Sequence, residues 1–412
     1  MPGSPLLHPT ALYHNPRADR QASYGAERRR VLSLEAHATA RRAIAAWPGY
    51  APTPLAALPG LAAAAGVGRL WYKDEGGRFG LGSFKALGGA YAVFRLLAAE
   101  VAARTGGPEP SAADLLAGRH RSVVSAITVT CATDGNHGRS VAWGAKTFGC
   151  GCVIYIHATV SDGRRDAIAA FGAEVVRTEG NYDDAVRRAG ADAAANGWLV
   201  VSDTSYDGYM DVPRDVMQGY TVMVQEVVEQ LPAGERPTHV FIQAGVGGLA
   251  AAVCGHLWER WGPDRPRLIV VEPDKAACLY ESARAGRPAT VTGDLGTIMA
   301  GLACGEVSLL AWTILEAGAD AFQTVTDDAA REAMRLLAAG TGGDRPLVAG
   351  ESAVAGLAGL LCALGAGAGK ELGLGPDSRI LLFGSEGDTD PDLYAAIVGR
   401  SADEVRAAAC AN

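Results

Sequence analysis

The sequence lacks the basic surface of a nucleic-acid-binding protein. Its formal net charge is −8, and it contains no long run of lysine or arginine. The short basic runs at residues 28–30 and 41–42 have acidic residues near them, as on a solvated helix face. We therefore expect no nucleic acid and no anionic membrane among its partners.

Membrane-spanning and secretory signals are also missing. A membrane span needs about 20 apolar residues in a row. The most apolar late stretch, residues 352–369, is broken by glycines and bordered by Lys370, so it predicts a buried helix instead. The N-terminus has no basic segment followed by an apolar one, so no signal peptide is expected.

Metal-binding and disulfide patterns do not appear among the cysteines. The chain has 8 cysteines, and none forms a CxxC pair with a second pair at zinc spacing. No metal site is expected. Scattered cysteines in a chain of this length are typical of a reduced, cytoplasmic protein.

The elements that are present predict an α/β fold. With 412 residues the chain exceeds one ordinary core, so two domains are expected. Short apolar runs alternate with helical segments, which favours doubly wound parallel sheets covered on both faces. Residues 1–50 are polar and contain several prolines, and they predict an arm over the body. The expected strands are residues 69–73, 123–129, 152–156, 174–177, 198–201, 239–243, 267–271 and 379–383.

Lys85 is the first residue that suggests a chemistry. It follows the turn Gly80–Ser83 and stands at the start of a helical segment. A helix N-terminus offers free N–H groups and the positive end of the helix dipole, which lowers the cost of a neutral amine. Schiff-base chemistry requires a neutral lysine. A lysine in this position is by itself more often a surface residue, so the motif needs support from others.

Three further loops supply that support. Thr133–Gly138 opens a helix after a strand, and its glycines let the backbone pass close to a flat ligand while Asn136 offers an amide N–H. Gln243–Ala250 is a glycine loop at a helix start, where successive N–H groups bind phosphate, although its spacing differs from the nucleotide fingerprints. Ser385 follows the last strand, where a hydroxyl can hydrogen-bond a ring nitrogen. Each loop alone is compatible with an ordinary turn, so their order along the chain is the specific feature.

In this order the motifs resemble the fold-type II pyridoxal 5′-phosphate (PLP) enzymes, the tryptophan-synthase-β-like group, and within it the diaminopropionate ammonia-lyases. The resemblance covers about residues 50–395. It implies two doubly wound domains with the active site in the cleft between them. The large PLP-binding domain would comprise residues 1–88 and 226–412, with residues 1–50 as its arm, and the small domain residues 89–225. The matching strings are Lys73–Glu75, Arg78–Lys85, Ala132–Gly138, Asp203–Thr204, Gly208–Tyr209, Gly245–Leu249, Thr297–Gly305, Gly350–Ser352 and Ser385–Asp390.

The resemblance also implies which residues hold the cofactor. Lys85 binds PLP covalently with Phe84 beside it, and Asn136 contacts the phenolic oxygen. Ser385 stands beside the pyridine nitrogen, where a neutral hydroxyl leaves the ring largely unprotonated and favours β-elimination over transamination. The phosphate loop consists of Gly245, Val246, Gly247, Gly248 and Leu249.

Asp134 is the most informative single residue of the resemblance. Serine and threonine dehydratases have a small residue at this point, whereas a carboxylate suits a substrate with a second, cationic amino group. By the same resemblance, Asp203 is a second acidic residue for that ammonium group. Lys85, once released, would take the α-proton of an L-substrate, and Asp134 that of a D-substrate. The other residues expected to line the substrate site are Ser83, Thr133 and Glu351.

The expected activity is α,β-elimination of 2,3-diaminopropionate to pyruvate and ammonia, with the enantiomer preference left open. The alternative is another PLP-dependent β-eliminating or β-replacing enzyme that acts on serine, threonine or a biosynthetic diamino acid. A non-catalytic PLP-binding or amino-acid-binding protein is a hypothesis of a different class. A homodimer is expected from symmetry and from the resemblance. A disulfide between Cys278 and Cys304 stays open, with two free thiols as the expected state.

Overall fold

The computed structural model describes residues 8–133 and 135–411, and the chain divides into two compact units. Unit 1 comprises residues 1–31, 52–77 and 223–412, and unit 2 comprises residues 32–51 and 78–222. The N-terminal 50 residues are therefore shared between the units, with the division after Val31. The functional labels expected for the two domains stay predictions.

Unit 1 is built on a seven-stranded sheet with the order β1-β10-β9-β8-β11-β3-β2. The strands from β10 to β3 run parallel, while β1 and β2 pair antiparallel at the two edges. The central strands β8, β9 and β11 are largely apolar and are buried except at the first residue of β9 and of β11, which explains why they were recognisable in the sequence. The bounds are β1 Thr10–His14, β2 Leu55–Ala57, β3 Arg69–Asp74, β8 His239–Gln243, β9 Arg267–Pro273, β10 Ala321–Val325 and β11 Arg379–Gly384.

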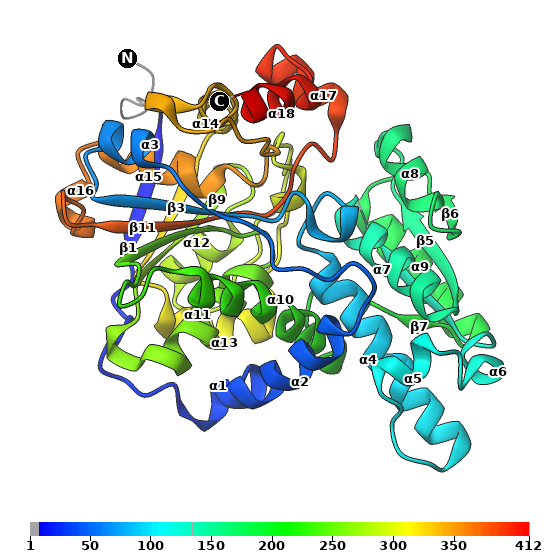
Figure 1. The fold of residues 1–412 in the computed structure, drawn as a ribbon. Helices are drawn as coiled ribbons and strands as arrows, with labels where there is room; N and C mark the ends of the chain where they lie inside the picture. The colour runs from blue at the N-terminus through cyan, green and yellow to red at the C-terminus, as the bar shows by residue number, and fades with distance from the viewer. Residues whose placement is uncertain (1–7, 134, 412) are drawn as a thin grey trace. The chain divides into compact units, whose positions relative to one another are not determined.

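Helices cover both faces of this sheet. In Figure 1, α11 and α13 lie on one side and α15 on the other. The predicted buried helix at 352–369 is α15, and it packs directly on the strands: a Cβ at Gly356 would meet the carbonyl oxygen of Phe241 at 2.6 Å. The bounds are α1 Gly25–Val31, α3 Pro59–Ala65, α11 Gly248–Trp261, α12 Cys278–Ala285, α13 Leu309–Gly318, α14 Asp327–Ala339, α15 Ala355–Gly365, α16 Gly369–Leu372, α17 Pro391–Val398 and α18 Ala402–Ala411.

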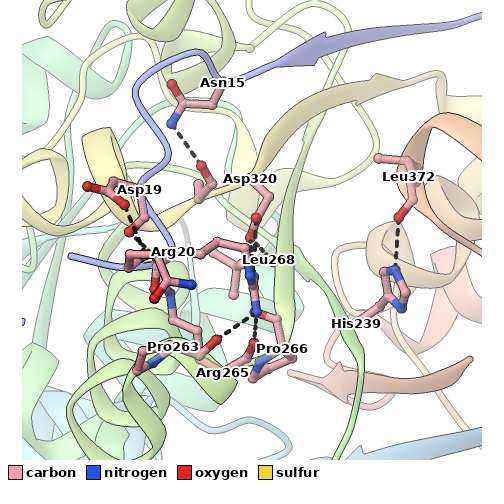
Figure 2. Close-up of polar contacts among 12 residues, drawn as sticks. Asn15, Asp19, Arg20, His239, Pro263, Arg265, Pro266, Leu268, Asp320 and Leu372 are labelled. Carbon is pink, nitrogen blue, oxygen red and sulfur yellow. Dashed lines mark hydrogen bonds and ion pairs between the residues drawn. The ribbon is translucent and has the colours of Figure 1, made fainter. Parts of the chain in front are cut away.

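The segment after β1 is tied to the rest of unit 1 by polar side chains, as Figure 2 shows. Asn15 donates from Nδ2 to the carbonyl oxygens of Glu316 and Ala319, both at 2.8 Å. Arg20 forms an ion pair with Asp320. The Asp320 carboxylate also accepts a hydrogen bond from the backbone N–H of Leu268. These long-range bonds order a stretch of chain that has little hydrophobic periodicity of its own.

Unit 2 contains a four-stranded parallel sheet with the order β6-β5-β4-β7. One expected strand was wrong. The run at 123–129 divides into helix α6 and strand β4, because pairing with β5 and β7 begins only at Thr128. The bounds are β4 Thr128–Ala132, β5 Gly151–Ile156, β6 Glu174–Arg177, β7 Leu199–Val200, α2 Leu34–Ala45, α4 Ala86–Thr105, α5 Ala112–Leu116, α6 Arg121–Val124, α7 Asn136–Phe148, α8 Asp162–Ala169 and α9 Tyr182–Asn196, with α10 Asp211–Gln230 continuing into unit 1.

Helix α4 is long and apolar enough to cross a membrane by length and composition, the one such helix among the residues that the structure describes. Two thirds of its apolar window (67%) is buried inside the protein, however. It packs along α7 and buries residues on every side, including Tyr91 and Phe94. An apolar helix covered in this way is typical of a protein core.

Candidate active site

Lys85 lies immediately before α4 and is held by a carboxylate. Its Nζ donates to Oδ2 of Asp203 at 2.6 Å, and the Lys85 side chain is 20% exposed. The same Nζ lies 5.6 Å from the ring centroid of Phe84 and 6.0 Å from that of Tyr220. The lysine is thus directed by an ion pair and two aromatic faces.

Asp203 follows β7 in a loop and faces two basic side chains. Besides Lys85, it lies 3.8 Å from Nδ1 of His137, whose Nε2 donates to the carbonyl oxygen of Val201 at 2.7 Å. Burial raises the pKa of Asp203, but the charges of Lys85 and His137 outweigh it and hold that pKa well below its usual range. Asp203 is therefore a carboxylate at neutral pH, suited to binding an ammonium group.

The segment Thr133–Gly138 forms the turn into α7. The Thr133 hydroxyl accepts hydrogen bonds from the backbone N–H groups of Gly135, the N-cap of α7, at 3.0 Å and of Gly138 in its first turn at 3.1 Å. Asn136 is the first residue of α7 and is half-buried. Asp134, the predicted second base, lies outside the described residues.

The glycine loop Gly245–Leu249 connects β8 to α11 in unit 1. Gly247 is the N-cap of α11 with φ +102°, and the first N–H groups of a helix have no partner within it. Within residues 8–133 and 135–411, the N–H groups of Gly245, Val246 and Gly247 have no acceptor in the chain either. A run of N–H donors at a helix start fits a phosphate group, so this loop is compatible with the predicted cofactor.

The backbone of Gly247 should be essential to this loop. An alanine there would be strained at φ +102°, and its Cβ would meet that of Ala311 at 3.0 Å. We expect Gly247→Ala to weaken PLP binding about 10-fold or more, because strain of 1–3 kcal/mol shifts the donors. Titration of the apoprotein with PLP, followed by absorbance, measures this. Gly399→Ala is the control, since Gly399 has φ +78° with no atom within 4 Å of its Cβ position. Equal affinities for the two variants would contradict the assignment.

Ser385 follows β11 and is buried. Its Oγ accepts a hydrogen bond from Nε2 of Gln243 at 2.8 Å. Gln243 ends β8, the strand beside β11; it opened the predicted glycine-loop motif, but no role of its own was predicted for it. A glutamine at the end of a buried strand was the available signal.

Glu351 belongs to a set of interlocked loops in unit 1. The backbone of Gly350 donates to the Glu386 carbonyl oxygen, and that of Ser352 donates to Oε1 of Glu386, both at 3.1 Å. The Ser352 hydroxyl in turn accepts from the backbone of Gly301 at 3.1 Å. Three of the strings that carry the family resemblance, near residues 301, 351 and 386, thus meet in one place. Ser352 is the residue that joins them, because its backbone donates to Glu386 and its hydroxyl accepts from Gly301, and the sequence alone did not identify this role.

The predicted site residues fall into two sets. Unit 2 carries Ser83, Phe84, Lys85, Thr133, Asn136 and Asp203, and unit 1 carries the glycine loop, Glu351 and Ser385. The expected position of the site between two domains stays a prediction. Cys278 and Cys304 are not joined by a disulfide. Among the described residues, no group of three or more His, Cys, Asp or Glu side chains is arranged to hold a metal ion.

Comparisons with known proteins agree with these observations. Residues 46–383 match the model of the pyridoxal-phosphate dependent enzyme family. A diaminopropionate ammonia-lyase from Escherichia coli (strain K12) is 42% identical over 358 residues, which cover 85% of this chain and 88% of that protein. The solved structure of the holo diaminopropionate ammonia-lyase from Escherichia coli covers 96% of this chain and 98% of its own, with a TM-score of 0.87 and 37% identity.

An L-threonine dehydratase from Corynebacterium glutamicum is more distant. It is 27% identical over 277 residues, which cover 66% of this chain and 59% of that protein. The predicted fold type and cofactor are confirmed by these matches. The chain belongs to the diaminopropionate ammonia-lyase family of pyridoxal-phosphate dependent enzymes.

Proposed function

We propose that this chain eliminates the β-amino group of 2,3-diaminopropionate and yields pyruvate and ammonia. Family membership supports the reaction type. The observation that carries the choice of substrate is the contact of 2.6 Å between Asp203 and Lys85. It identifies Asp203 as an ionised carboxylate that already binds an ammonium group.

The same contact indicates where the distal ammonium group of the substrate binds. When Lys85 is linked to the cofactor, its amine no longer pairs as a free ammonium with Asp203. The carboxylate then keeps only His137 of its two basic neighbours, and a carboxylate that has lost a cation favours a new one in the same place. The distal amino group of diaminopropionate supplies that cation, whereas the hydroxyl of serine or threonine does not.

The other site residues bind the cofactor or transfer the α-proton of the substrate. The N–H groups of the glycine loop hold the cofactor phosphate, Asn136 contacts its phenolic oxygen, and Ser385 contacts its ring nitrogen. When bound, PLP supplies an electron sink for the carbanion that forms when the α-proton leaves. Lys85 takes this proton from an L-substrate, and Asp134 takes it from a D-substrate. The role of Asp134 rests on the sequence alone.

A substrate panel tests the proposal. We expect pyruvate from L-diaminopropionate with a kcat/KM about 10- to 100-fold above that for L-serine, because a hydrogen bond to a charged group contributes about 1.5–3 kcal/mol. The assay compares both enantiomers of diaminopropionate with serine and threonine. In Asp203→Asn the preference for the diamino substrate should shrink. Equal or better turnover of serine or threonine by the unaltered protein would favour the dehydratase alternative.

We propose further that the protein acts in the cytoplasm as a homodimer. Cysteines that are scattered along the chain and form no disulfide among the described residues support a reducing compartment. Closed two-fold symmetry is the commonest form of a soluble oligomer.

A further inference from the structure

The hydrogen bond between Gln243 and Ser385 has a defined direction. Nε2 of Gln243 donates to the carbonyl oxygen of Phe383 at 2.7 Å and to Oγ of Ser385 at 2.8 Å. A backbone carbonyl can only accept, so the amide nitrogen, and not the amide oxygen, must face this side. The two amide hydrogens thus face these two oxygens, with the carbonyl oxygen of Ala353 as a longer third contact at 3.4 Å, and the serine oxygen acts as an acceptor.

The consequence concerns the hydroxyl hydrogen of Ser385. Among the described residues, Ser385 Oγ has Gln243 as its sole hydrogen-bonding partner, and the side chain is 5% exposed. Since its oxygen accepts from Gln243, its O–H remains available to donate. A ring nitrogen that receives this O–H must offer a lone pair, so it must be unprotonated.

We propose that Gln243 is a positioning residue that makes Ser385 a hydrogen-bond donor and so keeps the cofactor ring nitrogen neutral. The proposal rests on the assignment of Ser385 to that nitrogen. Gln243 ends β8, the strand that leads directly into the glycine loop, so one strand positions both the phosphate donors and the serine hydroxyl. A neutral ring is a weaker electron sink, which favours elimination over transamination.

The test uses the holoprotein with PLP labelled with ¹⁵N in the ring, and the readout is the nitrogen chemical shift. In Gln243→Glu a carboxyl oxygen takes the place of the amide nitrogen and accepts the hydrogen bond from the Ser385 O–H. The serine oxygen then faces the cofactor ring with a lone pair. A lone pair in that place favours the protonated form of the ring nitrogen. The ¹⁵N resonance should therefore move toward the protonated position, and the share of transamination product should rise. Gln243→Met removes the donor, and we expect PLP affinity to fall about 3- to 10-fold.

Gln323 provides a matched control in the same sheet. It is wholly buried on β10, and its Nε2 also donates to a backbone carbonyl, that of Gly359, and to a hydroxyl, that of Thr10, both at 2.9 Å. Gln323→Met should lose similar stability but leave the ¹⁵N shift and PLP affinity unchanged. A wild-type ¹⁵N shift in Gln243→Glu, wild-type PLP affinity in Gln243→Met, or the same changes in Gln323→Met would overturn the proposal.

Ser385→Ala separates this inference from the assignment on which it rests. We expect this variant to change the ¹⁵N shift in every case where Ser385 contacts the ring nitrogen. If Ser385→Ala changes the shift and neither Gln243 variant does, the role of Gln243 is wrong while the serine assignment stands. If Ser385→Ala leaves the shift unchanged while pyruvate is still formed, the serine assignment fails and the inference fails with it, but the lyase activity does not.

Discussion

Replacement of Lys85 by alanine is expected to abolish pyruvate formation from both enantiomers of diaminopropionate. The loss should reach about 10⁴-fold or more, because the variant lacks both the amine that holds the cofactor and a proton acceptor. The visible absorption band of the lysine-bound cofactor should disappear in the same variant. Steady-state pyruvate assays and an absorption spectrum of the purified protein measure the two effects.

Two control variants separate chemistry from stability. Lys85→Arg keeps a cation beside Asp203, so the carboxylate stays paired, but the guanidinium is not deprotonated in proteins and cannot replace the amine. It should fold like the unaltered protein and still be inactive. Lys146→Ala removes another lysine of unit 2, on α7, and should keep full activity. Substantial elimination by the Lys85→Ala or Lys85→Arg variant would overturn the assignment of Lys85.

Asp134→Asn is expected to impair the D-enantiomer selectively. If Asp134 removes the α-proton from the face opposite Lys85, kcat for the D-substrate should fall about 10²- to 10⁴-fold, the usual contribution of a positioned base. Turnover of the L-substrate, which uses Lys85, should fall by less than about 10-fold. Separate kinetic measurements with each enantiomer give the comparison.

Asp203→Asn distinguishes a base from a binding group. Both enantiomers carry the distal ammonium group that we assign to Asp203, so this variant should weaken the two substrates alike. An equal loss for both enantiomers in Asp134→Asn would mean that Asp134 also binds substrate and does not act as the base for one of them.

The cofactor and the reaction type were predictable because short, continuous motifs occur along the chain in the order that the resembling family shows. Lys85 at a helix start, the glycine loop at 245–249 and Ser385 after the last strand each depend on the turn in which they lie. The buried strands β8, β9 and β11 were equally predictable, since a strand covered on both faces is largely apolar.

Other elements escaped prediction for physical reasons. Strand β10 contains Gln323 and follows α13 closely, so its sequence lacks the clear turn and apolar run that mark the other strands. The residues at 123–129 are individually good strand formers, yet only pairing with β5 and β7 decides where β4 begins. Strand propensity reflects packing against neighbours, and a single sequence does not specify those neighbours.

The sequence by itself determined the cofactor, the lysine that we assign to it and the acidic residues suited to a diamino substrate. Only the tertiary structure decided two side-chain pairings, and these pairings set the charge of Asp203 and the hydrogen-bond direction of Ser385. Asp203 meets Lys85 across 118 residues of sequence, and Gln243 meets Ser385 across 142. The first keeps a carboxylate ionised and the second sets the direction of a hydroxyl. Both depend on the distance between side chains that only the folded chain brings together.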